Sequence, residues 1–170
     1  IMSKKPVEIA FSAIRRKGGR KFNKSVKIMV FGTFDGLHPG HLNFFKQARD
    51  LAPGGLLIIS VARDRNVLRI KGGLPILREK QRMALLKKTK LADRVVLAGL
   101  KNHLSHITQA RPDIIALGYD QKDYVKNLKK DLKSKNFSVR IVRLKPYKEK
   151  IYKNALLKKK PPRPITTPFD

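Results

Sequence analysis

The sequence predicts an α/β domain built on a single, doubly wound, five-stranded parallel sheet, with basic extensions at both ends. Five short apolar runs alternate along the chain with segments of helical spacing, a pattern typical of parallel strands that helices bury on both faces. Polar and glycine-containing stretches follow several of these runs, at the edge where open α/β sheets place their functional sites. The runs are 26–32, Leu56–Ala62, Arg94–Ala98, Asp113–Gly118 and Phe137–Leu144.

The first strand leads into the most informative part of the chain, the stretch 26–48. A short loop follows Gly32, and a helical pattern begins at Pro39, with His38 and His41 three residues apart around its first turn. The free N–H groups and the positive end of the helix dipole favour an anion there, and both imidazoles add donors on the same face. The alternative interpretation is a pair of ordinary surface histidines. A metal site is poorly supported, because no cysteine or third ligand lies in sequence reach.

The remaining segments supply the helices that the fold class requires. Apolar positions recur at helical spacing between the strands, and a short helix with an apolar face is also expected near the N-terminus. The chain should therefore divide into a basic extension 1–25 with this short helix, the α/β domain 26–145, and a basic, proline-rich segment 146–170. The expected helices are Pro6–Lys17, Pro39–Ala52, Arg78–Thr89, Leu104–Ala110 and Lys122–Lys133.

The stretch 62–82 follows the second strand, and the part of it before the helix expected from Arg78 should be a loop with a flexible pair of glycines. It holds Lys71 directly before two glycines, whose freedom can let the lysine swing onto a phosphate. The alternative is a solvated loop lysine. In the helix that follows, Arg82 lies three residues after Glu79, so an intrahelical ion pair is the alternative to a role of Arg82 in the site.

The composition of the chain restricts its chemistry and indicates the compartment in which it works. The chain has 170 residues, 41% of them hydrophobic, and no cysteine, which excludes disulfides and thiolate catalysis and favours a cytoplasmic protein. No apolar run approaches the ~20 residues needed to span a bilayer. The net charge of +28 is extreme, and half of it lies in 1–25 and 143–170. These ends are either solvated extensions or contacts for a polyanion such as RNA.

Residues 32–41, Gly-Thr-Phe-Asp-Gly-Leu-His-Pro-Gly-His, resemble the signature of the cytidylyltransferase-like nucleotidyltransferases. In that family a His-x-Gly-His motif after the first strand holds the triphosphate, which implies a Rossmann-like nucleotidyltransferase fold. The resemblance makes His38 and His41 the expected catalytic pair, together with Lys71 from a segment that closes over the site. It also implies that Gly32, Thr33, Phe34, Gly40 and Arg82 bind the nucleotide, with Asp35 beside them.

The tract 113–121 narrows the resemblance. Its sequence Asp-Ile-Ile-Ala-Leu-Gly-Tyr-Asp-Gln is similar to the archaeal-type FAD synthases, whereas glycerol-3-phosphate cytidylyltransferases usually place a second acidic residue where Tyr119 stands. The Ala-Arg-Asp after the second strand, which includes Arg63, fits the same group. Tyr119 is alternatively a packing residue. The resemblance places Gly118 and Asp120 at the nucleotide, with Tyr119 and Gln121 as neighbours. Asp120 can bind the nucleobase, the ribose or a metal-bound water there.

The segment after the fifth strand departs from the family. Its members commonly carry a turn of the form Ile-Ser-Ser-Thr or Ile-Ser-Thr-Thr there, at the N-terminus of a helix that holds the β- and γ-phosphates. Residues 150–157 are instead Lys-Ile-Tyr-Lys-Asn-Ala-Leu-Leu, so the hydroxyls of that turn are missing. Asn154 can still cap a helix, and Lys148, Lys150 and Lys153 can compensate electrostatically.

The resemblance implies a nucleotidyltransferase that moves a nucleoside monophosphate onto a phosphate-bearing acceptor, with ATP and FMN giving FAD. Mg²⁺ or another divalent cation is expected to bridge the substrate phosphates, and no protein ligand is assigned to it. Two alternatives stay open: a CTP-dependent cytidylyltransferase of the glycerol-3-phosphate type, and a catalytically weakened RNA- or ribosome-binding protein on the same fold. RNA contact through the basic ends and a homodimer through the N-terminal helix are further expectations, and no membrane partner is expected.

Overall fold

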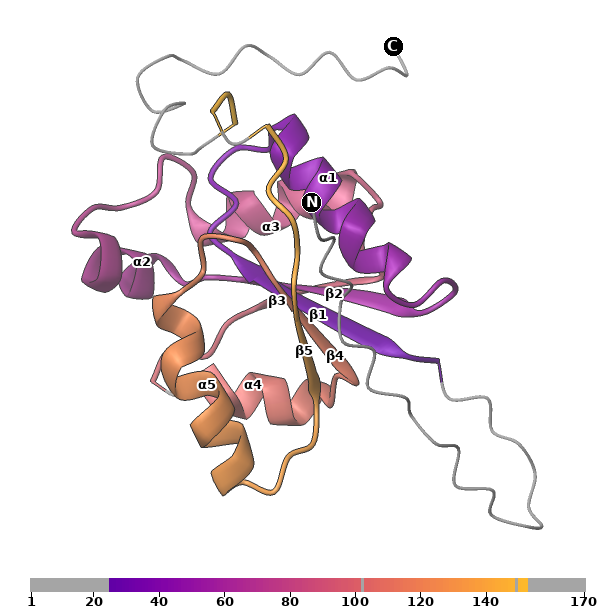
Figure 1. The fold of residues 1–170 in the computed structure, drawn as a ribbon. Coiled ribbons are helices and arrows are strands. Elements are labelled where there is room, and N and C mark those ends of the chain that lie inside the picture. The colour runs from indigo at the N-terminus through magenta and orange to yellow at the C-terminus, as the bar shows by residue number, and fades with distance from the viewer. Residues whose placement is uncertain (1–24, 102, 149, 153–170) are drawn as a thin grey trace, which may run out of the picture.

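The computed structural model describes residues 25–101, 103–148 and 150–152, which form one five-stranded sheet flanked by helices (Figure 1). All four pairings between neighbouring strands are parallel, in the order β3-β2-β1-β4-β5, so the predicted fold class is confirmed. The strands are β1 (Lys27–Gly32), β2 (Leu56–Val61), β3 (Arg94–Leu97), β4 (Ile114–Leu117) and β5 (Arg140–Arg143). The helices are α1 (Pro39–Asp50), α2 (Asp64–Lys71), α3 (Glu79–Lys88), α4 (His103–Ala110) and α5 (Asp123–Ser134).

Helices cover both faces of the sheet, as the apolar runs predict. Successive residues of a strand point to opposite faces, so Ile28 and Val30 of β1 pack into one core while Met29 and Phe31 pack into the other. The first core includes Phe45 of α1 and Leu86 of α3, and α4 and α5 lie on the other face (Figure 1). Because β1 is central and buried on both sides, its carboxyl end is held firmly at the point where the site is expected.

The edge strands are short and basic. The strand β5 begins only at Arg140, whereas the apolar pattern predicted a start at Phe137. The reason is that the backbone N–H of Phe137 donates to the carbonyl of Leu132 and so completes the end of α5 instead of joining the sheet. At the other edge, β3 spans four residues and begins at the exposed Arg94.

The loop expected between the second strand and Arg78 is wrong over its first half, because residues Asp64–Lys71 form α2. Asp64 lies in the first turn and Lys71 in the last, which suits the helix dipole. Gly72, with φ of 72°, ends the helix in the left-handed conformation that glycine adopts at least cost. Lys71 is therefore held at the end of a helix, and the remaining loop begins only after it.

The expected helix Pro6–Lys17 and residues 153–170 lie outside the described residues, so they stay predictions. Within the residues that are described, no helix combines the length and apolar character needed to cross a membrane.

A buried arginine joins the elements that surround the carboxyl ends of β1 and β2. The Arg82 side chain is 0% exposed and its guanidinium donates to the backbone carbonyls of Thr33 and Ala62, directly after β1 and β2. It also donates to the carbonyl of Leu77 and pairs with the carboxylate of Asp64 at 2.6 Å. The alternative pair with Glu79 does not form, because Glu79 binds Arg63 at 3.1 Å instead.

We expect Arg82→Leu to lower the free energy of unfolding by about 3–5 kcal/mol, because the carboxylate of Asp64 and three carbonyls lose their buried partner. Urea denaturation measures the loss. The matched control is Arg78→Leu, whose side chain is 66% exposed and reaches Asp64 only at 3.9 Å. That change should cost less than about 0.5 kcal/mol, and equal losses in the two variants would contradict the framework role of Arg82.

Candidate active site

The candidate site lies where the carboxyl ends of β1, β2 and β4 meet (Figure 1). Four segments gather at this end of the sheet: the loop 33–38, the end of α2 with the loop after it, the loop 118–121 and the turn 147–152. Side-chain contacts join residues of these segments that lie far apart in the sequence. The topology therefore brings together the predicted site residues that lie far apart in the chain.

The two histidines are stacked on each other at the start of α1. His38 is the N-cap residue, and its ring lies 3.7 Å from that of His41, with 24° between the ring planes. Gly40 makes room for this arrangement, since a side chain there would approach the His38 ring at 2.9 Å and the Cβ of Tyr152 at 3.1 Å. Pro39, at the start of the helix, has no N–H to satisfy. The motif thus places both imidazoles beside the N-terminus of the helix.

His41 is a half-buried, neutral imidazole. Burial is the main cause that lowers its pKa from 6.5 to about 3, and the neighbouring charges of His38 and Lys71 lower it further. A hydrogen bond with the backbone of Gly36 partly offsets these effects. The Nδ1 atom of His41 is buried and has no hydrogen-bond partner among the described residues. A buried polar atom without a partner is costly, so this nitrogen is suited to receive a ligand.

The loop before α1 is fixed by its own side chains. Phe34 has a positive φ of 52° and is only 3% exposed, with its ring packed edge-on against His41 at 5.3 Å. That ring covers Gly32, where a Cβ would come within 2.5 Å of it. The carboxylate of Asp35 accepts hydrogen bonds from the backbone N–H groups of Ile76 and Leu77 at 2.8 and 2.9 Å. Phe34 therefore holds the loop by packing into its interior, and Asp35 holds it by binding the backbone at Ile76 and Leu77.

Lys71 lies next to the motif loop. Its Nζ is 3.2 Å from Oγ1 of Thr33, so the structure brings Lys71 to the end of β1 near the histidines. Arg63, the N-cap residue of α2, points elsewhere: it donates to the carbonyl of Ala98 and pairs with Glu79. The buried Arg82 contacts the backbone of Thr33 from behind the loop. Of these three basic residues, Lys71 is the one that lies on the exposed side.

The loop after β4 is tied to β1 and β5. The amide of Gln121 donates to the carbonyl of Phe31 at 2.8 Å and accepts from the N–H of Gly118 at 2.9 Å. Arg143 donates to the carbonyls of Gly118, Tyr119 and Gln121. Asp120 is exposed at the tip of this loop. Arg143 was not expected from the sequence, because it appears there as one of many basic residues.

The turn 147–152 reaches the histidine pair. The N–H groups of Ile151 and Tyr152 donate to the carbonyl of Lys148, which closes the turn. The ring of Tyr152 lies parallel to that of His38, with centroids 5.9 Å apart and 11° between the planes, and Tyr147 stacks on Tyr152 in turn. The sequence distinguishes this segment only by its missing hydroxyls, so Tyr152 is not among the predicted site residues. Lys153 and Asn154 lie outside the described residues.

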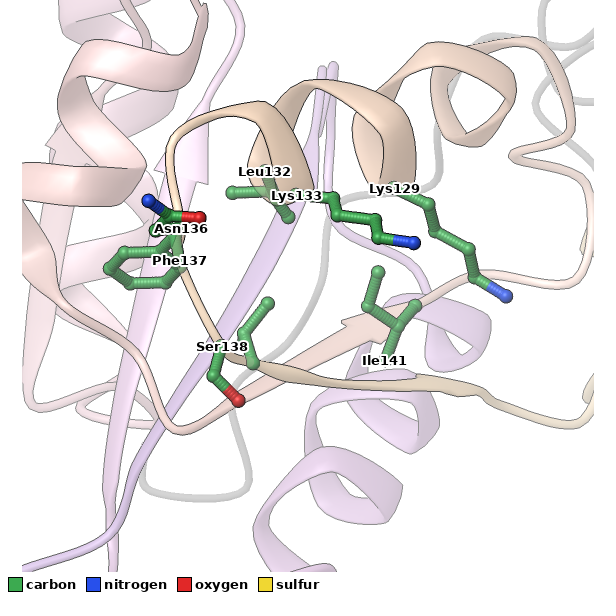
Figure 2. A pocket seen from close by; sticks show the side chains of 8 residues that line it. Lys129, Leu132, Lys133, Asn136, Phe137, Ser138 and Ile141 are labelled. Atoms are coloured by element: carbon green, nitrogen blue, oxygen red, sulfur yellow. The ribbon is translucent and has the colours of Figure 1, made fainter.

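A separate hollow of about 510 Å³ contains none of the predicted site residues. It lies between the end of α5 and the start of β5, where Figure 2 shows Lys129, Leu132 and Phe137 among its lining side chains. Parallel strands begin at this end of the sheet, so the hollow is remote from the carboxyl ends. Among the described residues, no group of three or more His, Cys, Asp or Glu side chains is placed to hold a metal ion.

Comparisons with known proteins show sequence similarity to one family. The sequence profile of the cytidylyltransferase-like family matches residues 29–167. The chain is 41% identical over 122 residues to the FAD synthase of Aciduliprofundum boonei, covering 72% of this chain and 80% of that protein. It is 42% identical over 126 residues to the FAD synthase of Thermococcus sibiricus, covering 73% of this chain and 82% of that protein.

Two solved structures share the fold. One, a protein from Thermoplasma volcanium described as a lipopolysaccharide core biosynthesis protein, is 35% identical, with a TM-score of 0.65 over 72% of this chain and 98% of that one. The other, from Archaeoglobus fulgidus and of unknown function, has a TM-score of 0.56 over 71% of this chain and 90% of that one. At 17% identity, this second likeness concerns the fold alone.

The pH dependence of stability should carry the signature of His41. Its pKa in the folded chain, about 3, is below the ordinary 6.5, so its contribution to stability is present above pH 6.5 and is lost as the pH falls toward 3. For one proton the slope is about 1.4 kcal/mol per pH unit. Replacing His41 with Gln should flatten the curve of unfolding free energy below pH 6.5, as measured by urea denaturation. Parallel curves for the two proteins would show that His41 titrates normally.

The position of Tyr152 can be tested by NMR, because the chain has only four histidines. Tyr152→Ala removes the parallel ring, so the ring Cε1–H resonance of His38 should shift, while that of His106 serves as an internal control. Tyr152→Phe keeps the ring and should leave both resonances in place. If the His38 resonance is insensitive to Tyr152→Ala, the turn does not lie on the motif in solution.

Proposed function

The chain belongs to the cytidylyltransferase-like family and is a nucleotidyltransferase, and we propose that it transfers the adenylyl group of ATP to FMN, giving FAD and pyrophosphate. The observation that carries the proposal is the stacked pair His38 and His41 at the N-terminus of α1, with Lys71 beside the same loop. The choice of ATP and FMN is supported by relatives that are FAD synthases, 34–43% identical to this chain over most of its length.

In the proposed reaction, a phosphate oxygen of FMN attacks the α-phosphorus of ATP in line. A new P–O bond forms there while the bond to the leaving pyrophosphate breaks. The nucleophile is already an anion, so no side chain has to remove a proton. Catalysis then consists of holding the two substrates in line and stabilising negative charge on the α-phosphate and on pyrophosphate.

The histidines and the start of α1 are proposed to bind the triphosphate. The helix N-terminus supplies partial positive charge and the imidazoles supply N–H donors. His41 is neutral in the free protein, with one ring nitrogen buried and unpaired. A phosphate oxygen at this nitrogen favours a proton on it, since the negative charge of the ligand opposes the effect of burial. Triphosphate binding should therefore strengthen His41 as a donor.

Lys71 is proposed to hold the phosphate of the acceptor. Its ammonium group already lies beside Thr33, at the base of the motif loop, and Gly72 directly after it allows the end of α2 to adjust. Oxygen anions on both substrates would otherwise repel each other as they approach. A lysine between them offsets this repulsion without taking part in bond formation.

The other predicted residues are assigned by where they lie. Arg82 and Phe34 are buried, so we assign them to positioning the backbone of the loop 33–38. Asp35, Arg63, Gln121 and Lys148 likewise hold loops and turns through contacts within the protein. The groups proposed to line the nucleotide itself are Gly32, Thr33, Gly40, Gly118, Tyr119 and Asp120, at the ends of β1 and β4 and the start of α1.

A divalent cation such as Mg²⁺ is proposed to arrive with the nucleotide and to neutralise phosphate charge when bound. The described residues offer no cluster of protein ligands, so the proposal assigns its coordination to the phosphates. A cytoplasmic location, RNA contact through the basic ends and a homodimer stay predictions from the sequence.

Pyrophosphate release tests the function, with ATP or CTP combined with FMN or glycerol 3-phosphate in the presence of Mg²⁺. Turnover is expected with ATP and FMN, with FAD as the second product. Turnover with CTP and glycerol 3-phosphate would instead support the cytidylyltransferase. No turnover with any pair, together with RNA binding that weakens as salt rises, would support the binding protein.

Replacing His41 with Ala should lower kcat on the order of 10²–10³-fold, by analogy with the loss of one donor to a transition-state oxyanion. Steady-state kinetics with ATP and FMN measure the change, and circular dichroism checks the fold. The matched control is Lys46→Ala on the exposed side of α1, whose ammonium group pairs with Asp50 at 2.8 Å, and it should leave kcat unchanged. An unchanged kcat in the His41 variant would remove this histidine from the mechanism.

A further inference from the structure

We propose that an exposed apolar surface at the end of α2 and on the loop after it, made of Ile70, Leu74 and Ile76, binds the flat ring system of the acceptor. We call it the flap surface. The inference rests on the proposed function, because it concerns the second substrate of the same site. It adds a binding surface for the part of the acceptor that does not react, and so a basis for acceptor choice.

The flap surface concentrates apolar exposure in a short piece of the chain. Ile70 and Ile76 are 72% and 74% exposed, and Leu68 and Leu74 are 45% and 46% exposed. These four residues make up half of the large hydrophobic side chains that are exposed in the described part of the chain. Single exposed hydrophobic residues are ordinary, but this density of them within nine residues next to the candidate site makes the segment a candidate binding surface. Leu68 lies two residues before Ile70 and so on another side of α2, and it is not counted in the flap surface.

The helix α2 is built to leave this surface open. Val67 is its only residue that is buried, and Figure 1 shows α2 standing to one side of the sheet, away from the layers formed by the other helices. Its first turn is nevertheless anchored, because Asn66 donates to the carbonyl of Gly99 at 2.9 Å and Asp64 pairs with Arg82. The apolar side chains are therefore presented on a fixed support.

Two contacts connect the flap surface to the reacting groups. Lys71 follows Ile70 directly, and its Nζ lies 3.2 Å from Oγ1 of Thr33. At the other end of the loop, the carboxylate of Asp35 binds the backbone N–H groups of Ile76 and Leu77. The apolar residues thus stand on both sides of the lysine proposed to hold the acceptor phosphate.

The chemistry of the surface selects one class of ligand. Arg65, Arg69 and Lys71 are the charged residues between 65 and 76, so the apolar side chains are interleaved with positive charge only. An anion that carries a large planar ring system with an apolar edge, such as FMN, can satisfy both features at once. Glycerol 3-phosphate offers the phosphate but no apolar group to cover the isoleucines. The flap surface therefore favours a flavin phosphate over a small polyol phosphate.

The test is the double variant Ile70→Ser/Ile76→Ser. The KM for FMN should rise on the order of tenfold while the KM for ATP stays within about twofold, because only contacts to the ring are lost. Binding of riboflavin, followed by quenching of its fluorescence, should weaken to a similar extent, since it has the ring without the phosphate. The matched control is Val26→Ser, an exposed apolar residue before β1 at the opposite end of the sheet, which should change neither value.

The possible failures are distinguishable. If the wild-type chain turns over ATP and FMN but the double variant keeps the same KM for FMN and the same riboflavin affinity, the flap surface proposal is overturned and the function stands. If the wild-type chain has no activity with FMN, the proposed adenylyltransferase function is overturned. If the double variant in addition binds riboflavin as tightly as the wild type, the proposal for the flap surface is overturned as well. A wild-type dimer that becomes a monomer in the double variant, measured by light scattering, would assign the surface to a second copy of the chain instead.

Discussion

The buried guanidinium of Arg82 is the interaction on which the arrangement of the site depends. A fully buried positive charge is costly unless every donor is used and a counter-ion lies beside it. Here the partners are the carboxylate of Asp64 and the backbone carbonyls that follow β1 and β2. The charge therefore fixes the ends of two strands relative to α2 and α3. The exposed Lys71 and the loop 33–38 are placed by a residue that does not itself reach the surface of the site.

The fold could be predicted because its causes are local and repeated. Branched apolar runs such as Leu56–Val61 are most stable as strands that helices cover on both faces. The motif at His38 and His41 marks the carboxyl end of the first strand. Spacing could not identify the partner of Arg82, since Glu79 on the same helix looks equivalent to Asp64 on another. It also could not identify α2, whose polar sequence resembles a loop and whose stability depends on contacts made by Asp64 and Asn66.

The candidate site was predicted to the extent that it is encoded in contiguous residues. His38, Gly40 and His41 form one motif, and their stacking follows from helical spacing. Tyr152 and Arg143 could not be found in this way, because their importance comes from contacts across more than twenty residues of sequence. The missing hydroxyls after β5 were visible in the sequence, but the aromatic ring that the same turn places against His38 depends on the path of the chain.

The short, basic edge strands limit how copies of this protein can assemble. A sheet grows by adding a strand to an unpaired edge, and long flat edges are the ones most open to it. Here β3 begins at Arg94, and β5 both begins and ends with an exposed arginine, so two copies brought edge to edge would bring like charges together. The charged edge strands therefore oppose the addition of further copies to the sheet. Contacts through the helices or loops of the described domain are therefore favoured over sharing of strands between copies.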